Sequence, residues 1–229
     1  MFSQEFKVRY SDIGPEGYAE LAQIMAWFQD AATDHSEAVG YGASVLKKMG
    51  AAWIVLNWDV KMLGRVYYNQ RVCVETWASG FASMYGHRMF NLKDENGEIL
   101  ATGESVWLLY DLNQNKFRKV TDEMCLRYGC DTKMPSEVLK KWKLSAPEIV
   151  NKSAQWTVRR SDTDTNQHTN NVSYVRFLID SVDNGGALTH MCVTYKKALY
   201  LNENAQLDIG DGCAVISRDG EVCTLFEFE

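Results

Sequence analysis

The spacing of apolar positions predicts two helices in this chain. Between about Tyr18 and Val39, apolar or small side chains return at steps of three or four, at Leu21, Met25, Phe28, Ala32 and Ser36. This spacing places one continuous apolar stripe along a helix. A second amphipathic stretch begins near Asn171, and its apolar side chains are Val172, Val175, Phe177, Leu178 and Val182. We expect the pair Gly185 and Gly186 to end this helix, because glycine commonly follows the last helical residue.

Runs rich in β-branched and aromatic residues follow each helix and predict antiparallel strands. In the first half we expect strands near Trp53–Met62, Arg71–Ser79, Tyr85–Leu92 and Ile99–Tyr110. In the second half we expect them near Leu188–Lys197, Ala205–Ile209, Cys213–Ser217 and Val222–Phe228. The last two strands of each half are joined through Asn96-Gly97 and Asp219-Gly220, and such dipeptides are strong hairpin signals.

The order of these elements occurs twice. The segment Val8–Asp12 (VRYSD) returns as Val158–Asp162 (VRRSD), and each copy is extended in character and leads through a polar turn into a helix. The shared order of strand, turn, helix and meander favours a duplicated unit over coincidence. We therefore predict an α+β chain with an N-terminal unit at 1–125, a linker at 126–150 and a C-terminal unit at 151–229.

The composition is that of a globular protein with room for a substantial core. The chain has 229 residues, of which 46% are hydrophobic and only 3 are proline. Its net charge of −6 argues against nucleic acid as the main partner, because phosphate binding requires a basic face. An acidic protein partner stays open, since it needs only a local basic patch.

Cysteine usage and the lack of long apolar runs indicate the compartment. The six cysteines form no C-x-x-C pair, and no histidine stands beside them at zinc-binding spacing. We therefore expect reduced thiols in the core and a cytoplasmic protein. No stretch approaches the roughly 18 apolar residues of a membrane-spanning helix, and residues 1–7 lack the features of a signal peptide. We expect no membrane partner.

The densest polar run of the chain stands directly before the second helix. If this run is extended, Asp164, Asn166 and His168 point to one side, because strand side chains alternate. Asn170 or Asn171 can then cap the helix, whose first backbone N–H groups would lie beside the three side chains. A carboxylate or imidazole can take a proton from water, an amide can orient that water, and the N–H groups can stabilise an oxyanion. The run therefore suits transfer of an acyl group to water.

Two other interpretations of this run stay open. Aspartate, asparagine and threonine before a helix are common turn and cap residues. Metal binding is a third option, but one histidine and one aspartate provide fewer ligands than a typical zinc site has.

The duplication favours the catalytic interpretation. In the first copy, the three positions are occupied by Gly14, Glu16 and Tyr18. If the polar residues only built a turn, we would expect them in both copies. Their presence in one copy predicts one site per chain. Asp12 and Asp162, which do match, are better interpreted as turn or cap residues.

The run Asp164-x-Asn166-Gln167-His168-x-Asn170-Asn171-x-x-Tyr174 resembles the signature of plant and bacterial acyl-acyl-carrier-protein (acyl-ACP) thioesterases. Gly97–Leu100, Thr102–Trp107 and Val74–Trp77 resemble the same family, and the resemblance covers nearly the whole chain. It implies two tandem hotdog domains, each a long helix wrapped by an antiparallel sheet. It implies hydrolysis of the thioester between a fatty acid and acyl carrier protein, without metal or cofactor. It places Asp164, Asn166 and His168 in the site and most of the acyl pocket in the first hotdog.

The chain departs from the family at one position. In many members the strand after the second helix carries a glutamate, followed in plant members by a cysteine. Here Tyr195, Lys196 and Lys197 precede Ala198 and Leu199. Both a second carboxylate and a cysteine nucleophile are absent there. We therefore expect Asp164 or His168 to be the general base, with the helix start at Asn170 and Asn171 stabilising the oxyanion.

Other functions and partners stay open at this stage. A thioesterase for acyl-coenzyme A would share the chemistry, and a non-catalytic acyl-binding module is favoured by Ala198. The linker lysines, at positions 133, 140, 141 and 143, form either a solvated face or a docking surface for acidic carrier protein. Sheet pairing between hotdogs is compatible with a homodimer. His35, His87 and His190 are interpreted as structural residues.

Overall fold

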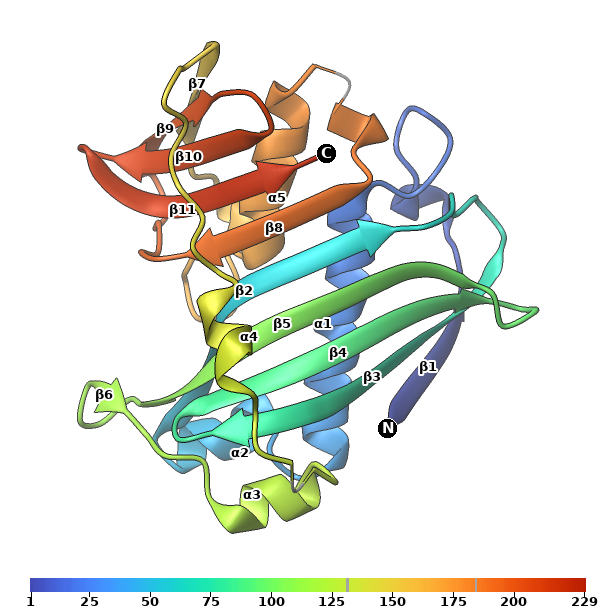
Figure 1. Cartoon of the computed structure of the whole chain (residues 1–229), viewed down its shortest axis with the longest axis vertical. Helices are drawn as coiled ribbons and strands as arrows, with labels where there is room; N and C mark the ends of the chain where they lie inside the picture. Colours follow the sequence, from blue (N-terminus) through green and yellow to red (C-terminus); the bar gives the residue numbers. More distant parts are fainter. Residues whose placement is uncertain (131, 184) are drawn as a thin grey trace.

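One antiparallel sheet runs through the whole chain in the computed structural model, which describes residues 1–130, 132–183 and 185–229 (Figure 1). Its strand order is β1-β3-β4-β5-β2-β8-β11-β10-β9-β7, with β6 beside β5. The first-half strands are β1 (Phe2–Lys7), β2 (Ala51–Met62), β3 (Arg71–Ala82), β4 (Tyr85–Asp94), β5 (Ile99–Asp111) and β6 (Lys116–Phe117). The others are β7 (Lys152–Thr157), β8 (His190–Tyr195), β9 (Asn204–Ile209), β10 (Cys213–Arg218) and β11 (Glu221–Phe228). The two halves therefore meet where β2 pairs with β8.

Two helices cover one face of this sheet, and the linker crosses the other (Figure 1). Helix α1 (Leu21–Ala38) lies behind the first half and α5 (Asn171–Ser181) behind the second, and the two helices are in contact. The second helix ends before the glycine pair, because Val182 is already extended (φ −83°, ψ 137°). The expectation that Gly185 and Gly186 end it is therefore wrong. Within the described residues, no helix is long and apolar enough to cross a membrane.

The predicted duplication is visible in the backbone. Strand β1 is followed by a 3-10 turn at Tyr10–Asp12 and then α1, and β7 is followed by a 3-10 turn at Arg160–Asp162 and then α5. Asp12 accepts the backbone N–H of Arg9 at 2.8 Å, and Asp162 accepts that of Arg159 at 2.8 Å. The two aspartates are thus turn residues, as predicted. Each half is one helix against an antiparallel sheet, so the α+β prediction of tandem hotdogs is confirmed.

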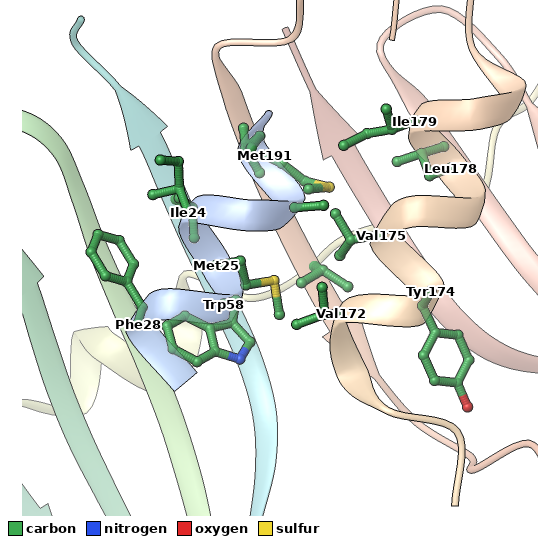
Figure 2. Close-up of a cluster of buried hydrophobic side chains, with 14 of the residues drawn as sticks. Ile24, Met25, Phe28, Trp58, Val172, Tyr174, Val175, Leu178, Ile179 and Met191 are labelled. Carbon is green, nitrogen blue, oxygen red and sulfur yellow. The ribbon is translucent and has the colours of Figure 1, made fainter. Parts of the chain in front are cut away.

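The two halves share a continuous core between the helices and the sheet. Figure 2 shows Met25 of α1 between the helices, close to Val172 and Val175 of α5, with Trp58 of β2 and Met191 of β8 on the sheet side. These side chains are buried. Burying each large apolar side chain stabilises the fold by about 1.5–3 kcal/mol. The buried core is therefore shared by the two halves.

The described residues also contain three short α-helices: α2 (Ala43–Lys48), α3 (Asp122–Arg127) and α4 (Ser136–Lys140). Helix α3 spans residue 125, and its Met124 packs with Tyr128 in a small core beneath α2. Helix α4 lies on the front of the sheet in Figure 1. Its N-cap is Pro135, and the Ser136 hydroxyl donates to the Glu137 carboxylate (3.0 Å).

Candidate active site

The polar run before α5 forms a tight turn rather than the extended strand expected from sequence. The backbone N–H of Asp164 donates to the His168 carbonyl (2.8 Å), and that of Gln167 donates to the Asp164 carbonyl (3.0 Å). Gln167 has a φ of 65°, in the left-handed region. Asp164, Asn166 and His168 are thus gathered by a turn and not by strand alternation. The geometric basis of that prediction was wrong.

The carboxylate of Asp164 holds this turn together. Its Oδ1 accepts the backbone N–H groups of Asn166 (2.8 Å) and His168 (3.1 Å). Its Oδ2 lies 3.5 Å from Nδ2 of Asn166. The turn therefore occupies much of the hydrogen-bonding capacity of this carboxylate. Asp164 is better suited to shape the loop than to accept a proton from water.

The same turn occurs between β4 and β5. There Oδ1 of Asp94 accepts the backbone N–H groups of Asn96 and Glu98, both at 2.9 Å. The backbone N–H of Asp94 donates to the Glu98 carbonyl (3.0 Å), and Gly97 takes the left-handed position with φ 85°. The residue types Asp and Asn at these spacings are therefore explained by turn geometry alone.

The first copy of the repeat also has this turn, built from other residues. The N–H of Gly14 donates to the Tyr18 carbonyl (2.9 Å), and Gly17 takes the left-handed position with φ 86°. The premise that a shared turn would require the same side chains in both copies is therefore wrong. Gly17 needs no special stabilisation there, because glycine adopts positive φ without steric cost. Unlike those of Asp164 and Asn166, the side chain of His168 makes no hydrogen bond within the described turn.

The start of α5 lies beside the turn, as predicted. Oδ1 of Asn170 accepts the backbone N–H of Val172 (2.9 Å), so Asn170 is the N-cap. Nδ2 of Asn171 donates instead to Oε1 of Gln29 on α1 (3.3 Å). The start of α5 is therefore tied to the first half of the chain.

The segment after β8 packs against the turn on its other side. The backbone N–H and the hydroxyl of Thr169 both donate to the Leu199 carbonyl, at 2.9 and 2.8 Å. Ala198, where many family members carry glutamate, thus stands next to a residue that contacts the loop. The Tyr174 hydroxyl accepts the backbone N–H of Leu199 (2.8 Å) and so fixes this segment to α5. Burial raises the pKa of Tyr174 to about 12, so its hydroxyl keeps its proton.

His168 is exposed, and its ring packs on an aromatic neighbour. The imidazole meets the ring of Tyr200 edge-on, with centroids 5.2 Å apart. Among the described residues, no side-chain hydrogen bond to its two ring nitrogens is found, so both are open to solvent or substrate. Asn166 is also exposed. An imidazole and an amide therefore stand accessible beside the N-terminus of α5, which is an arrangement able to activate water and stabilise negative charge.

Sequence reasoning missed a second polar cluster, on the outer face of the sheet. Nε2 of His87 bonds Glu104 at 2.8 Å, and Nε2 of His190 bonds Asp59 at 2.8 Å. The bond from His87, with a further contribution from the Lys141 ammonium and against the effect of burial, lowers the pKa of Glu104 to about 2. Asp59 and His190 come together only through the pairing of β2 with β8. The pattern of residues along the chain does not indicate which strands of the two halves pair.

Two family models match the chain and together cover most of it. Residues 1–128 match the acyl-ACP thioesterase N-terminal domain, and residues 145–208 match the acyl-ACP thioesterase C-terminal domain. The oleoyl-acyl carrier protein thioesterases 1 and 2 of Arabidopsis thaliana, both chloroplastic, are 24% and 25% identical to the chain. Those alignments cover 82% and 96% of this chain but only 57% and 64% of the two plant proteins.

A solved structure shows the same fold along nearly the whole chain. It is an acyl-ACP thioesterase from Bacteroides thetaiotaomicron, with 18% sequence identity and a TM-score of 0.85. The superposition covers 99% of this chain and 97% of that one.

Proposed function

The chain belongs to the acyl-ACP thioesterase family, and from this premise we propose that it hydrolyses fatty acyl-acyl carrier protein to free fatty acid and holo carrier protein. The match to both domain models supports this activity. The chain spans less than two thirds of the length of the plant relatives it matches.

We assign the general base to His168. In the proposed reaction, water attacks the thioester carbonyl and gives its proton to the imidazole, while Asn166 orients the water or the carbonyl. The N-terminus of α5, at Asn170 and Asn171, stabilises the oxyanion through the helix dipole. The C–S bond then breaks, and His168 returns the proton to the leaving thiolate. The observation that carries this assignment is that two backbone N–H groups occupy Oδ1 of Asp164, which leaves the exposed imidazole as the acceptor.

We further propose a division of work between the halves. The N-terminal unit holds most of the acyl chain. Its predicted range of 1–125 extends through Tyr128, because Tyr128 packs with Met124 of α3. The unit at 151–229 supplies the chemistry, and the residues between them act as the linker. The contact of Asn171 with Gln29 supports this arrangement, because a chain held along α1 would bring its thioester end to the start of α5.

Thiol release from carrier-linked acyl thioesters tests the assignment. His168→Ala should lower kcat/KM by about 100-fold or more, the usual loss on removing a positioned acid–base group. Asp164→Ala should have a smaller effect, through the loop. Asp94→Ala is the matched control, because it removes the same contacts from the β4–β5 turn and should leave the rate unchanged. Full activity in folded His168→Ala would contradict the assignment.

A second candidate is an acyl-binding protein without hydrolytic activity, which Ala198 favours. Tight binding of acyl chains with no thiol release from carrier or coenzyme A thioesters would support it. Faster release from coenzyme A thioesters than from carrier thioesters would instead favour an acyl-coenzyme A thioesterase.

For docking of the acidic carrier protein we propose Lys140 and Lys143, which are exposed. Lys141 is a weaker candidate than sequence suggested, because its ammonium pairs with Asp59 and Glu104. Charge reversal at Lys140 and Lys143 should raise KM for carrier-linked substrate and spare small thioesters. Equal effects on both substrates would argue against docking at this surface.

We also propose a compartment and an assembly for the chain. Six free cysteines are consistent with a reducing compartment, for which we propose the cytoplasm. The terminal strands β1 and β7 leave sheet edges at which a second copy could pair, so a homodimer stays a prediction.

A further inference from the structure

Side chains of the types that bind metal ions come from both halves and lie in one row on the outer face of the sheet. In the strand register, Glu104 of β5 lies opposite Asp59 of β2, and Asp59 lies opposite Cys192 of β8. His190 stands two residues before Cys192 and therefore on the same side of β8. Lys141, directly after α4, reaches the row from the linker that crosses the front of the sheet in Figure 1.

Three of these side chains converge on one point. Oδ1 of Asp59 lies 2.8 Å from Nε2 of His190, and Sγ of Cys192 lies 3.8 Å from the same nitrogen. The three ligand atoms all lie within 4.8 Å of one another. A tetrahedral zinc ion with ordinary bond lengths would separate such donors by about 3.3–3.6 Å. Small side-chain adjustments would therefore suffice to enclose an ion.

The arrangement does not suit nucleophilic catalysis by Cys192. In a catalytic triad, the two nitrogens of the histidine contact the nucleophile and the carboxylate separately. Here Asp59 and Cys192 approach the same nitrogen of His190, so the imidazole cannot pass a proton between them. Three donor atoms that lie within 4.8 Å of one another can instead enclose a bound cation.

The negative charges of Asp59 and Glu104 also favour a nearby cation. Carboxylates directly opposite each other on neighbouring strands destabilise a sheet, and Asp59 and Glu104 stand in that relation. The Lys141 ammonium bonds both, at 2.6 Å from Oδ2 of Asp59. This bond uses the oxygen of Asp59 that does not face His190. The other oxygen, the imidazole and the thiol remain directed at one another.

We propose that Asp59, His190 and Cys192 bind a divalent transition ion of the zinc class, and that the Lys141 ammonium is a built-in competitor for the same carboxylate. The mixed carboxylate, imidazole and thiolate set suits zinc. Binding releases the thiol proton of Cys192 to solvent and forms a metal–sulfur bond. Because Asp59 belongs to β2 and the other two ligands to β8, the ion joins the two halves. Metal binding by these three side chains requires neither the hydrolase activity nor His168.

Titration of the purified full chain with Co²⁺ tests the site. The wild type should bind one equivalent and develop a thiolate-to-cobalt charge-transfer band that Zn²⁺ abolishes. Cys192→Ser should lose the band, and Asp59→Asn should weaken binding by about tenfold or more. Cys73→Ser is the matched control, because Cys73 is a half-buried strand thiol outside the row and should keep the band. Lys141→Gln should tighten binding by about tenfold, because a neighbouring positive charge opposes a divalent ion.

A second measurement needs no variant. Alkylation of the wild type, mapped by mass spectrometry, should show Zn²⁺ protecting Cys192 while Cys73 reacts as before. The proposal is overturned if stoichiometric Co²⁺ gives no thiolate band in the wild type. A band that persists in Cys192→Ser, or equal alkylation of Cys192 with and without Zn²⁺, overturns it as well.

Discussion

At the scale of single residues, the fold holds His35 in its neutral form. Its ring stacks on Phe2 and meets the edge of Tyr128, and Nη1 of Arg88 donates to its Nδ1 at 2.8 Å. Burial, and then the positive charge of Arg88, lower the pKa of His35 to about 4. The Arg88 guanidinium is itself buried, which lowers its pKa to about 10, so it stays charged at neutral pH.

This setting makes His35 a source of acid sensitivity. The folded protein binds the His35 proton less readily than the unfolded chain, so stability is complete above about pH 6.5 and falls as the pH drops toward 4. At pH 4.5 the loss should be about 2–3 kcal/mol. Urea unfolding of the wild type and His35→Gln at pH 7 and pH 4.5 measures it. The variant should lose less stability between the two pH values, and an equal loss in both proteins would refute the assignment.

Residue identity also explains which turn could be predicted. The β4–β5 turn was recognised because Gly97 follows Asn96, and this pair indicates a hairpin. The turn at Asp164 has the same hydrogen bonds, but Gln167 holds the left-handed position, which a residue of this type seldom adopts. The period-two pattern of Asp164, Asn166 and His168 therefore predicted a strand where the backbone folds back.

At the scale of elements, α5 depends on its first turn. Oδ1 of Asn170 accepts the N–H of Val172, while the Asn170 carbonyl accepts that of Ser173. Asn170→Ala should therefore reduce the free energy of unfolding by about 1 kcal/mol. Asn170→Asp should restore most of it, because aspartate is an equally good cap beside the helix dipole. Chemical denaturation measures both variants, and a neutral Asn170→Ala would show that the neighbouring contacts alone fix the helix start.

The elements that sequence recovers are those with a long periodic pattern. The strand expected at Arg71–Ser79 is observed at Arg71–Ala82, and the first helix lies inside its expected range. Helix α3 was missed because six residues, with Met124 as their buried member, show no repeated apolar stripe. The cluster of Asp59 with His190 was missed for a different reason. It depends on the register between β2 and β8, which no local pattern encodes.

At the scale of the whole molecule, the shared core predicts a single cooperative unfolding transition. Met25 of α1 lies between the two helices, in one buried cluster with Val172 and Val175 of α5, and the sheet continues across the pairing of β2 with β8. Met25→Ala leaves a cavity that borders both halves and should cost about 2–5 kcal/mol. Its effect should appear equally in both halves, although the substitution lies in the first.

Native-state hydrogen exchange resolves this prediction by strand. In the wild type, the amides of β4 and β10 should exchange with similar free energies, and Met25→Ala should lower both by the same amount. Leu92→Ala is the comparison variant, because Leu92 is fully buried on β4 of the first half. If the halves unfold together, Leu92→Ala should lower protection in β10 as well. Loss confined to β4 in either variant would mean that the C-terminal hotdog keeps its fold alone, despite the common core.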